Sequence, residues 1–258
     1  MNTTATLTEP GVIEQLREED LDEARSIQSM MLPTEPLRAG AIRISHAFQP
    51  VSEVGGDFLD YFELTDGCIG LYLGDVSGKG LPAAMYSALA VGTLRGVHKT
   101  SQPPAQVLST LNRRLMLRGP SRRHAAMQYA VFDPRTREMQ IASAGMPGPF
   151  HLSGRKCRAL EIQGIPPGLF DPSITYDAAT ITIEPDDCVL FFTDGISDAF
   201  GPNQESFGLD RLQTICEVLP HDSPSELLAR IFSEVDLFTT GCPQHDDMAV
   251  AAFCYCND

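Results

Sequence analysis

Four aspartates share one pattern along this chain: each lies where an apolar, strand-like stretch begins or ends, beside glycine or a second aspartate. They are Asp57, which follows two glycines; Asp75, which ends Leu71–Gly74; Asp194, between Thr193 and Gly195; and Asp246, which Asp247 follows. A single Asp-Gly pair at a strand end is adequately explained as a turn. Turns explain four such ends on apolar strands less well, although only the folded chain can show whether they meet.

If these carboxylates converge, they need cations. Two carboxylates about 4 Å apart repel by roughly 4 kcal/mol at an effective dielectric constant near 20. Hard oxygen ligands of this kind favour Mg²⁺ or Mn²⁺ over Zn²⁺. Two such ions about 3.5–4 Å apart can hold a water between them and stabilise its attack on phosphorus. The aspartates therefore predict a pair of Mn²⁺ or Mg²⁺ ions as cofactor, with water as the nucleophile.

Two other phosphate chemistries fit the sequence poorly. The run from Gly74 to Gly80 resembles a phosphate-binding P-loop, but three residues separate Gly74 from Gly78 where the P-loop needs four, and Gly80 follows Lys79 in place of Ser or Thr. No cysteine precedes an arginine by six positions, which is the arrangement of cysteine-based phosphatases. The seven cysteines are instead expected to be reduced, buried thiols of a cytosolic protein.

Charge and composition limit the partners. The 258 residues include 19 basic and 34 acidic ones, which gives a formal charge of -15. Phosphate backbones and anionic lipid would repel such a chain, so we expect neither nucleic acid nor a membrane surface as partner. No apolar run approaches the ~18 residues of a membrane span, and the first ten residues contain no apolar signal core. We therefore expect a cytoplasmic protein.

The N-terminal region predicts a disordered tip followed by one helix. Residues 1–10 are polar, and the helical pattern runs from Gly11 to Leu32, where Pro33 and Pro36 stop it. Its apolar stripe comprises Leu16, Leu21, Ala24, Ile27 and Met31. The helix either packs on the domain or pairs with a second copy or an upstream partner. A five-residue gap in the stripe argues against a long coiled coil.

Beyond Pro36 the pattern changes to short alternating segments with grouped helices. Strands are predicted at Ile42–Phe48, Phe58–Leu64, Cys68–Asp75, Met127–Phe132, Met139–Ala144, Ile181–Ile183, Cys188–Thr193 and Met248–Tyr255. Helices are predicted at Leu81–Val97, Pro104–Leu117, Leu209–Leu219 and Pro224–Phe238, and turns at 65–67, 133–135 and 153–155. Because consecutive strands are joined by turns, this order favours an α+β fold of antiparallel sheets packed face to face, with helices outside.

The sequence resembles a known family at these residues. The matching stretches are Glu53–Phe58, Gly74–Ala84, Ile165–Phe170, Phe192–Ala199, Phe207–Gly208 and Asp246–Met248, with a lead-in from Ala24 to Pro33. They resemble the PPM-type metal-dependent protein phosphatases, specifically the bacterial SpoIIE and RsbU branch. The resemblance covers nearly everything from about Ala24 onward, in the same order.

This resemblance implies a fold and a role for each acidic residue. The fold would be a four-layer αββα sandwich, with residues 33–258 as the phosphatase domain and residues 1–32 as a regulatory or dimerisation segment. Asp75 would bridge two ions, and the Val76 carbonyl would bind one of them. Asp57 would serve the second ion, Asp194 and Asp246 the first, and Asp247 would support these ligands from behind.

The family also suggests a substrate and partners. Its usual substrates are phosphoserine or phosphothreonine on small anti-anti-sigma proteins of the STAS type, in partner-switching control of transcription. A homodimer through the N-terminal helix and an upstream regulatory protein are further expected partners. No residue clearly matches the family's substrate-phosphate contact, for which Lys79, Arg43 and Arg25 are candidates. A second hypothesis is a phosphatase-fold regulator that binds partners with little or no turnover.

Overall fold

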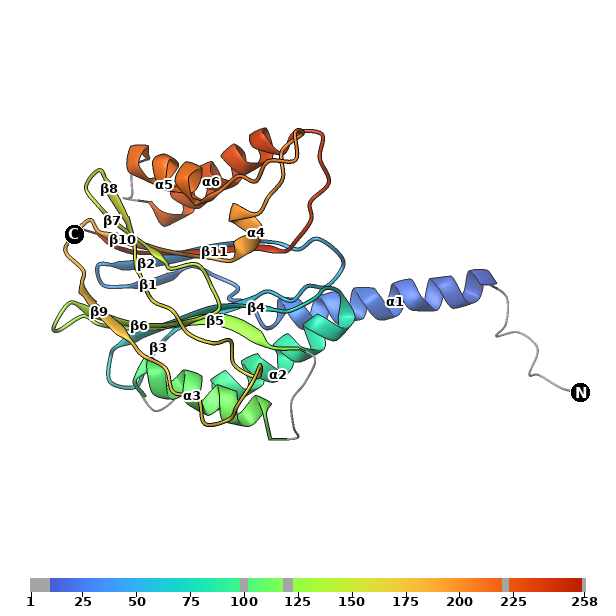
Figure 1. Cartoon of the computed structure of the whole chain (residues 1–258), viewed down its shortest axis with the longest axis horizontal. Helices are drawn as coiled ribbons and strands as arrows, with labels where there is room; N and C mark the ends of the chain where they lie inside the picture. Colours follow the sequence, from blue (N-terminus) through green and yellow to red (C-terminus); the bar gives the residue numbers. More distant parts are fainter. Residues whose placement is uncertain (1–9, 98–101, 118–122, 220–222, 257–258) are drawn as a thin grey trace, which may run out of the picture.

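Two antiparallel sheets form the centre of the molecule (Figure 1). The computed structural model describes residues 10–97, 102–117, 123–219 and 223–256, and the side chains of the first helix from Arg17 onward. One sheet has six strands in the order β1-β2-β11-β10-β7-β8, and the other has five in the order β3-β4-β5-β6-β9. The first comprises β1 (Leu37–Ala39), β2 (Ile42–Gln49), β7 (Phe150–Ser153), β8 (Lys156–Ala159), β10 (Cys188–Phe192) and β11 (Met248–Tyr255). The second comprises β3 (Phe58–Glu63), β4 (Ile69–Val76), β5 (Ala125–Asp133), β6 (Glu138–Ala144) and β9 (Ala179–Thr182).

Helices cover the outer face of each sheet. Helices α2 (Leu81–Val97) and α3 (Pro104–Leu115) lie on the five-stranded sheet, and α5 (Leu209–Val218) and α6 (Pro224–Phe238) lie on the six-stranded sheet (Figure 1). The short α4 (Asp194–Ser197) follows β10. This arrangement confirms the predicted αββα sandwich. Among the described residues, no helix is both long and apolar enough to cross a bilayer.

The period-two alternation of the strands explains why this sandwich holds together. In β4, Leu71 and Leu73 face the core between the sheets, whereas Tyr72 and Val76 face the helices α2 and α3. Both faces of β4 are therefore buried, which is why it reads as an almost continuous apolar run. Burying one such large side chain contributes about 1.5–3 kcal/mol relative to leaving it exposed.

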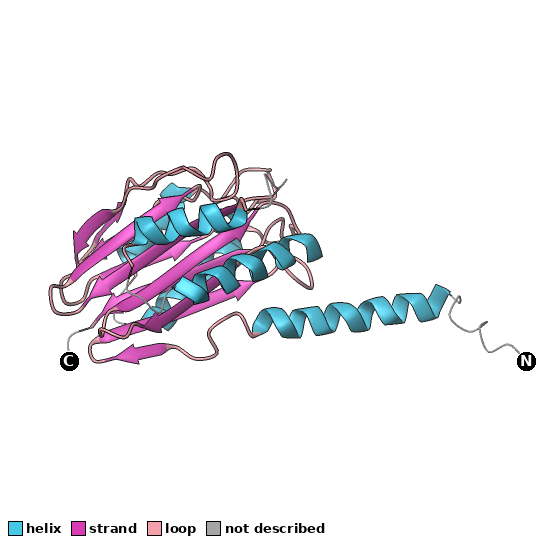
Figure 2. Ribbon diagram, turned by 90° about the horizontal axis from the view of Figure 1, so that it is seen from below, coloured by secondary structure: helices cyan, strands magenta, loops and turns pink. Residues whose placement is uncertain are grey.

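The first helix, α1 (Pro10–Ser29), differs from the others because much of it extends away from the sandwich (Figures 1 and 2). Its bounds agree with the predicted helix to within a few residues. Of the predicted disordered tip at residues 1–10, residues 1–9 lie outside the described residues, as does the side chain of Leu16; the prediction is wrong for Pro10, which begins α1. From Arg17 to Ser29, one side chain of α1 is buried, that of Gln28.

Three strands, β1, β7 and β8, were not predicted. The turn expected at 153–155 is present, but the two four-residue strands that it joins are short and partly polar. Their pairing with each other and with β10 supplies what the local sequence lacks. Strand β1 has three residues and depends in the same way on β2.

The expectation of reduced cysteines is wrong for two of the seven. Cys188 of β10 lies directly opposite Cys254 of β11, and the two form a disulfide with their Cα atoms 4.1 Å apart. The antiparallel register brings together residues 66 positions apart, which no local pattern in the sequence could indicate. Cys68, Cys157 and Cys216 are buried and form no disulfide, as expected.

Candidate metal centre

The strand register carries all the predicted aspartates to one end of the sandwich. Phe58 of β3 lies opposite Gly74 of β4, so Asp57 and Asp75 are neighbours one position further along. In the other sheet, Phe192 of β10 lies opposite Val250 of β11. Asp194 follows β10 and Asp246 precedes β11, so both reach the same end of the molecule.

Asp57 and Asp75 form the buried centre of the cluster. Asp57 is 2% exposed, and the two carboxyl groups hydrogen-bond to each other. Burial, followed by the negative charges of Asp75 and Asp247, raises the pKa of Asp57 well above its usual range. Burial, followed by the charge of Asp194, raises the pKa of Asp75 to about 7. The pair can therefore share a proton when no cation neutralises it.

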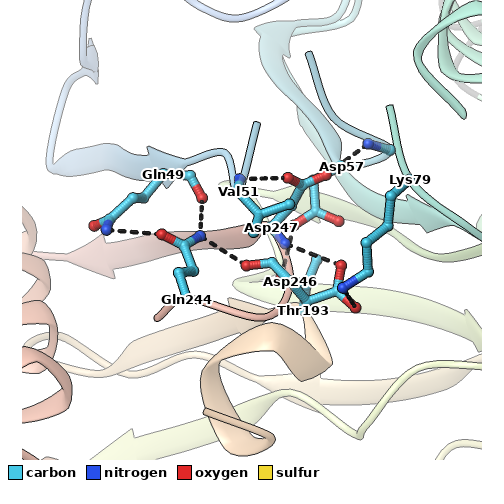
Figure 3. Close-up of polar contacts among 9 residues, drawn as sticks. Gln49, Val51, Asp57, Lys79, Thr193, Gln244, Asp246 and Asp247 are labelled. Carbon is cyan, nitrogen blue, oxygen red and sulfur yellow. Dashed lines mark hydrogen bonds and ion pairs between the residues drawn. The ribbon is translucent and has the colours of Figure 1, made fainter. Parts of the chain in front are cut away.

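Asp194 and Asp246 form the outer part of the cluster. Burial raises the pKa of Asp194, and the charges of Asp198 and Asp246 add to this effect. The Oδ2 atom of Asp246 lies 3.2 Å from Nζ of Lys79 (Figure 3). Both of these side chains are about half exposed, so they mark the open side of the cluster.

Asp247 faces away from the opening and fixes the backbone that precedes Asp57. Its Oδ1 accepts the N–H of Val51 at 2.8 Å, and its Oδ2 accepts the N–H of Gly56 at 2.6 Å. A Cβ atom at Gly55 would lie 2.1 Å from this carboxylate, and one at Gly56 would lie 2.7 Å from the Val76 carbonyl oxygen. The two glycines are therefore required by close approach, and they let the chain pass between Asp247 and Val76.

Two helices hold the same glycine segment from the outside. The Gln28 amide of α1 donates to the Gly55 carbonyl at 2.8 Å and accepts the Gly55 N–H at 3.0 Å. Ser87 of α2 is fully buried and donates to the Gly56 carbonyl and to the Ala83 carbonyl. The position of Asp57 thus depends on contacts from both α1 and α2.

Thr193 links the two sheets at the cluster. Its hydroxyl donates to Oδ2 of Asp57 at 2.8 Å, and it accepts the N–H of Ala249 at 3.0 Å. The side chain is fully buried. One hydroxyl therefore orients a carboxylate of the five-stranded sheet from the end of a strand in the six-stranded sheet.

A pair of glutamines supports the backbone of Asp246 (Figure 3). Gln244 donates from Nε2 to the carbonyls of Gln49 and Asp246, at 2.9 and 2.7 Å, and Gln49 donates back to Gln244 Oε1 at 2.9 Å. The remaining oxygen of Asp246, Oδ1, accepts the N–H of Asp247 at 3.0 Å. Both carboxylate oxygens of Asp246 are therefore engaged.

The chemical type of the donor atoms suits divalent cations. Carboxylates from both sheets and the Val76 carbonyl offer hard oxygen ligands, which suit Mg²⁺ or Mn²⁺. The Lys79 ammonium already lies against Asp246 as a stand-in cation. Within the described residues, no group of three or more acidic, histidine or cysteine side chains is arranged closely enough to hold a metal ion.

Of the three basic candidates, Lys79 alone lies at the cluster. Arg25 bonds to Asp22 and to the Glu53 carbonyl. Arg43 lies near the opposite end of β2, opposite Cys254, and bonds to nearby carbonyls. The sequence did not indicate Arg123, whose guanidinium donates to the Ser77 carbonyl beside Asp75 and Val76.

Other supporting residues were also missed. Thr193 lies within the motif that was recognised, so its position beside Asp194 was the one available signal. Gln28, Ser87 and Gln244 carry no distinguishing pattern, because polar residues at such positions are usually solvated surface groups.

Comparison with known proteins finds a family match over most of the chain. The family model described as "Stage II sporulation protein E (SpoIIE)" matches residues 65–255. The chain is 25% identical to Protein IcfG of Synechocystis, over 97% of this chain but 44% of that protein. It is also 25% identical to the phosphoserine phosphatase RsbU of Bacillus subtilis, over 93% of this chain and 71% of that one.

Among solved structures, the SiaA-PP2C domain of Pseudomonas aeruginosa superposes with a TM-score of 0.84 at 20% identity. The match covers 96% of this chain and 99% of that domain, and it establishes a common fold. The chain spans less than half the length of Protein IcfG.

Proposed function

The chain belongs to the SpoIIE family, and from that premise we propose that it is a metal-dependent serine/threonine protein phosphatase. The observation that carries the proposal is the meeting of Asp57, Asp75, Asp194 and Asp246 from both sheets at one end of the sandwich. Such a cluster bears more negative charge than it can hold without cations, as the raised pKa values of Asp57 and Asp75 indicate.

The residues that would hold two Mn²⁺ or Mg²⁺ ions are Asp57, Asp75, the Val76 carbonyl, Asp194 and Asp246. Bound there, the ions would supply Lewis-acid chemistry for the attack of water on phosphorus. Asp75 interacts with Asp57, Asp194 and Asp246, so it would be the ligand common to both ions. Asp247 would act indirectly, because its buried carboxylate holds the N–H groups of Val51 and Gly56, which precede Asp57.

The remaining residues position these ligands. Thr193 orients Asp57 by hydrogen bonding, and Gln244 fixes the backbone at Asp246. Lys79 supplies a positive charge at the open side of the cluster, where a phosphorylated side chain would enter. Catalysis then needs no cysteine nucleophile, and the thiols of Cys157 and Cys216 are buried in the core beneath α5 and α6.

The proposed substrate is phosphoserine or phosphothreonine on a STAS-type anti-anti-sigma protein, with the enzyme beside it in the cytoplasm. The relative RsbU, named a phosphoserine phosphatase, supports this choice. The test is to incubate the protein with phosphorylated STAS proteins from the same genome, with and without Mn²⁺. Mn²⁺-dependent release of phosphate from one of them is expected, and no release from any would contradict the substrate assignment.

The second candidate is a phosphatase-fold regulator that acts by binding with weak or no turnover. A regulator of this kind has no need to keep an intact ligand set, whereas here every matched aspartate is present and reaches the cluster. Calorimetry with Mn²⁺ separates the two functions, because the regulator should bind the ion weakly or not at all.

We also propose that α1 mediates homodimerisation or contact with an upstream regulatory protein. Apolar side chains of α1, of the residue that follows it and of α2 remain exposed: Ile27 is 51% exposed, Met30 65% and Met85 67%. A hollow of about 170 Å³ between the two helices is lined by residues that include Ile27, Met31 and Met85. An exposed apolar stripe on a projecting helix is typical of a surface that a partner covers.

A further inference from the structure

Lys79 forms an ion pair with one of the proposed metal ligands. Its Nζ lies 3.2 Å from Oδ2 of Asp246. Among the ion pairs between described residues, this one involves a carboxylate of the cluster, whereas the others lie elsewhere. A cation at this place offsets part of the repulsion among carboxylates that burial makes costly to ionise.

The turn that carries Lys79 is anchored on both sides. Gly78 and Gly80, which flank it, have φ values of +91° and +68°, which side-chain-bearing residues rarely adopt. Arg123 donates to the Ser77 carbonyl, and Ser77 exchanges two hydrogen bonds with the backbone of His124. The start of the Lys79 side chain is therefore fixed relative to Asp75, while the ammonium itself remains half exposed.

The ion pair engages the Asp246 oxygen that no backbone group contacts. Oδ1 accepts the N–H of Asp247 at 3.0 Å, and Oδ2 is held by Lys79. A divalent ion that binds Asp246 through Oδ2 must replace the ammonium there. The ammonium and the ion repel each other, so they cannot share this oxygen at little cost.

We propose that Lys79 is a built-in competitor of the metal, whose ammonium holds Asp246 in the ion-free protein and is displaced when a divalent ion binds. This inference rests on the proposed metal-dependent function and adds a control on it. In the ion-free protein the ammonium offsets part of the negative charge at Asp246, and the affinity for Mn²⁺ is set lower than the aspartates alone would give. Activity then follows the supply of free ion over a higher concentration range.

The test compares Mn²⁺ binding by calorimetry in the wild-type protein, Lys79→Gln and Lys156→Gln. Lys156 lies exposed on β8, so its replacement makes the same change in net charge without a contact to the cluster. We expect Lys79→Gln to bind Mn²⁺ about tenfold more tightly than wild type, because a unit charge near a divalent ion is removed. Lys156→Gln should bind as wild type does.

Two further variants keep the result decisive. Lys79→Met should reproduce the tighter binding if loss of charge is the cause, and Lys79→Arg, which retains the charge, should not. Mn²⁺ affinity in Lys79→Gln that equals or falls below wild type overturns the inference and leaves the metal-dependent function standing. If neither wild type nor Lys79→Gln binds Mn²⁺, the inference and the proposed function fail together.

Discussion

The side-chain amide of Gln28 pairs with both backbone groups of Gly55, donating to its carbonyl at 2.8 Å and accepting its N–H at 3.0 Å. Gln28 is the buried side chain in the described part of α1, a helix that otherwise extends from the sandwich. The residue after Gly55 bonds to Asp247, and the next is Asp57. The helix that we propose as regulatory is thus joined to the metal-binding segment by two hydrogen bonds.

Gln28→Ala should weaken Mn²⁺ binding by about tenfold, because Gly55 and Asp57 lose their anchor to α1. The loss of two buried hydrogen bonds should also lower the free energy of unfolding by roughly 1–3 kcal/mol. Calorimetry and urea unfolding measure the two effects separately. Gln213→Ala is the matched control. Gln213 of α5 donates to the Cys157 carbonyl of β8 at 2.8 Å, away from the cluster. Equal Mn²⁺ affinity in wild type and Gln28→Ala would show that α1 does not support the site.

Replacement of the neighbours Asp246 and Asp247 by Asn should affect two different properties, Mn²⁺ affinity for the first and stability for the second. Asp247→Asn turns an amide N–H₂ towards the N–H of Val51 or Gly56, so the free energy of unfolding should fall by about 1–3 kcal/mol. Asp246→Asn removes a half-exposed charge, so stability should change by less than about 1 kcal/mol while Mn²⁺ affinity falls sharply. Urea unfolding without metal and Mn²⁺ titration distinguish the two. The same loss of stability in both variants would contradict these assignments.

The order of the strands and most helices could be predicted from the sequence because each has a strong local pattern. Leu81–Val97 and Pro224–Phe238 were predicted with the bounds that the structure shows, since a proline marks the first turn of each. Strands β7 and β8 have four residues each and alternate weakly. They exist because β10 offers an edge, which is a tertiary property.

The site, like the fold, could be predicted from the sequence only in part. The aspartates could be named because strand ends beside glycine are visible in the sequence. The sequence does not show which distant residue will reach them: Gln28 meets Gly55 across 27 positions, and Thr193 meets Asp57 across 136. Such contacts follow from the packing of the two sheets and α1, so they become evident in the fold.

The ion-free protein should lose stability as pH rises through the titration of Asp75. Burial raises the pKa of Asp75 to about 7, whereas the unfolded chain has a value near 3.9. Between these values the folded state binds more protons than the unfolded state, so the free energy of unfolding falls with rising pH. Asp75→Asn removes this group, and its stability relative to wild type should increase by roughly 2 kcal/mol between pH 5 and pH 8.

Urea unfolding of both proteins in a chelator at several pH values measures this difference. The difference reports Asp75 together with its effect on Asp57, whose pKa the Asp75 charge raises, because titrating groups away from this pair are shared. These include His46 and His124, whose pKa values burial lowers and whose contribution therefore has the opposite sign. A constant difference between the two proteins across the range would show that Asp75 ionises normally.

The exposed stripe on α1 predicts self-association. Ile27→Glu places a charge in the apolar surface between α1 and α2, so it should convert a dimer to a monomer without unfolding the chain. Sedimentation velocity of wild type and variant measures the mass. Ser26→Glu is the control, since Ser26 is exposed on the same helix outside that hollow. If the wild-type protein sediments as a monomer, and a variant without residues 1–32 does so too, self-association through α1 is contradicted. The upstream protein then remains as the proposed partner of α1.

The most direct measurement compares hydrolysis of an aryl phosphate and of a phosphoserine peptide by wild type and Asp75→Asn, each with added Mn²⁺ and with a chelator. Asp75 is the proposed ligand common to both ions, so its replacement should lower the Mn²⁺-dependent activity by at least about a thousandfold while the circular dichroism spectrum stays unchanged. Wild-type activity should likewise disappear in the chelator and return when Mn²⁺ is restored. Undiminished Mn²⁺-dependent turnover by Asp75→Asn would contradict the assignment of this cluster as the catalytic metal centre.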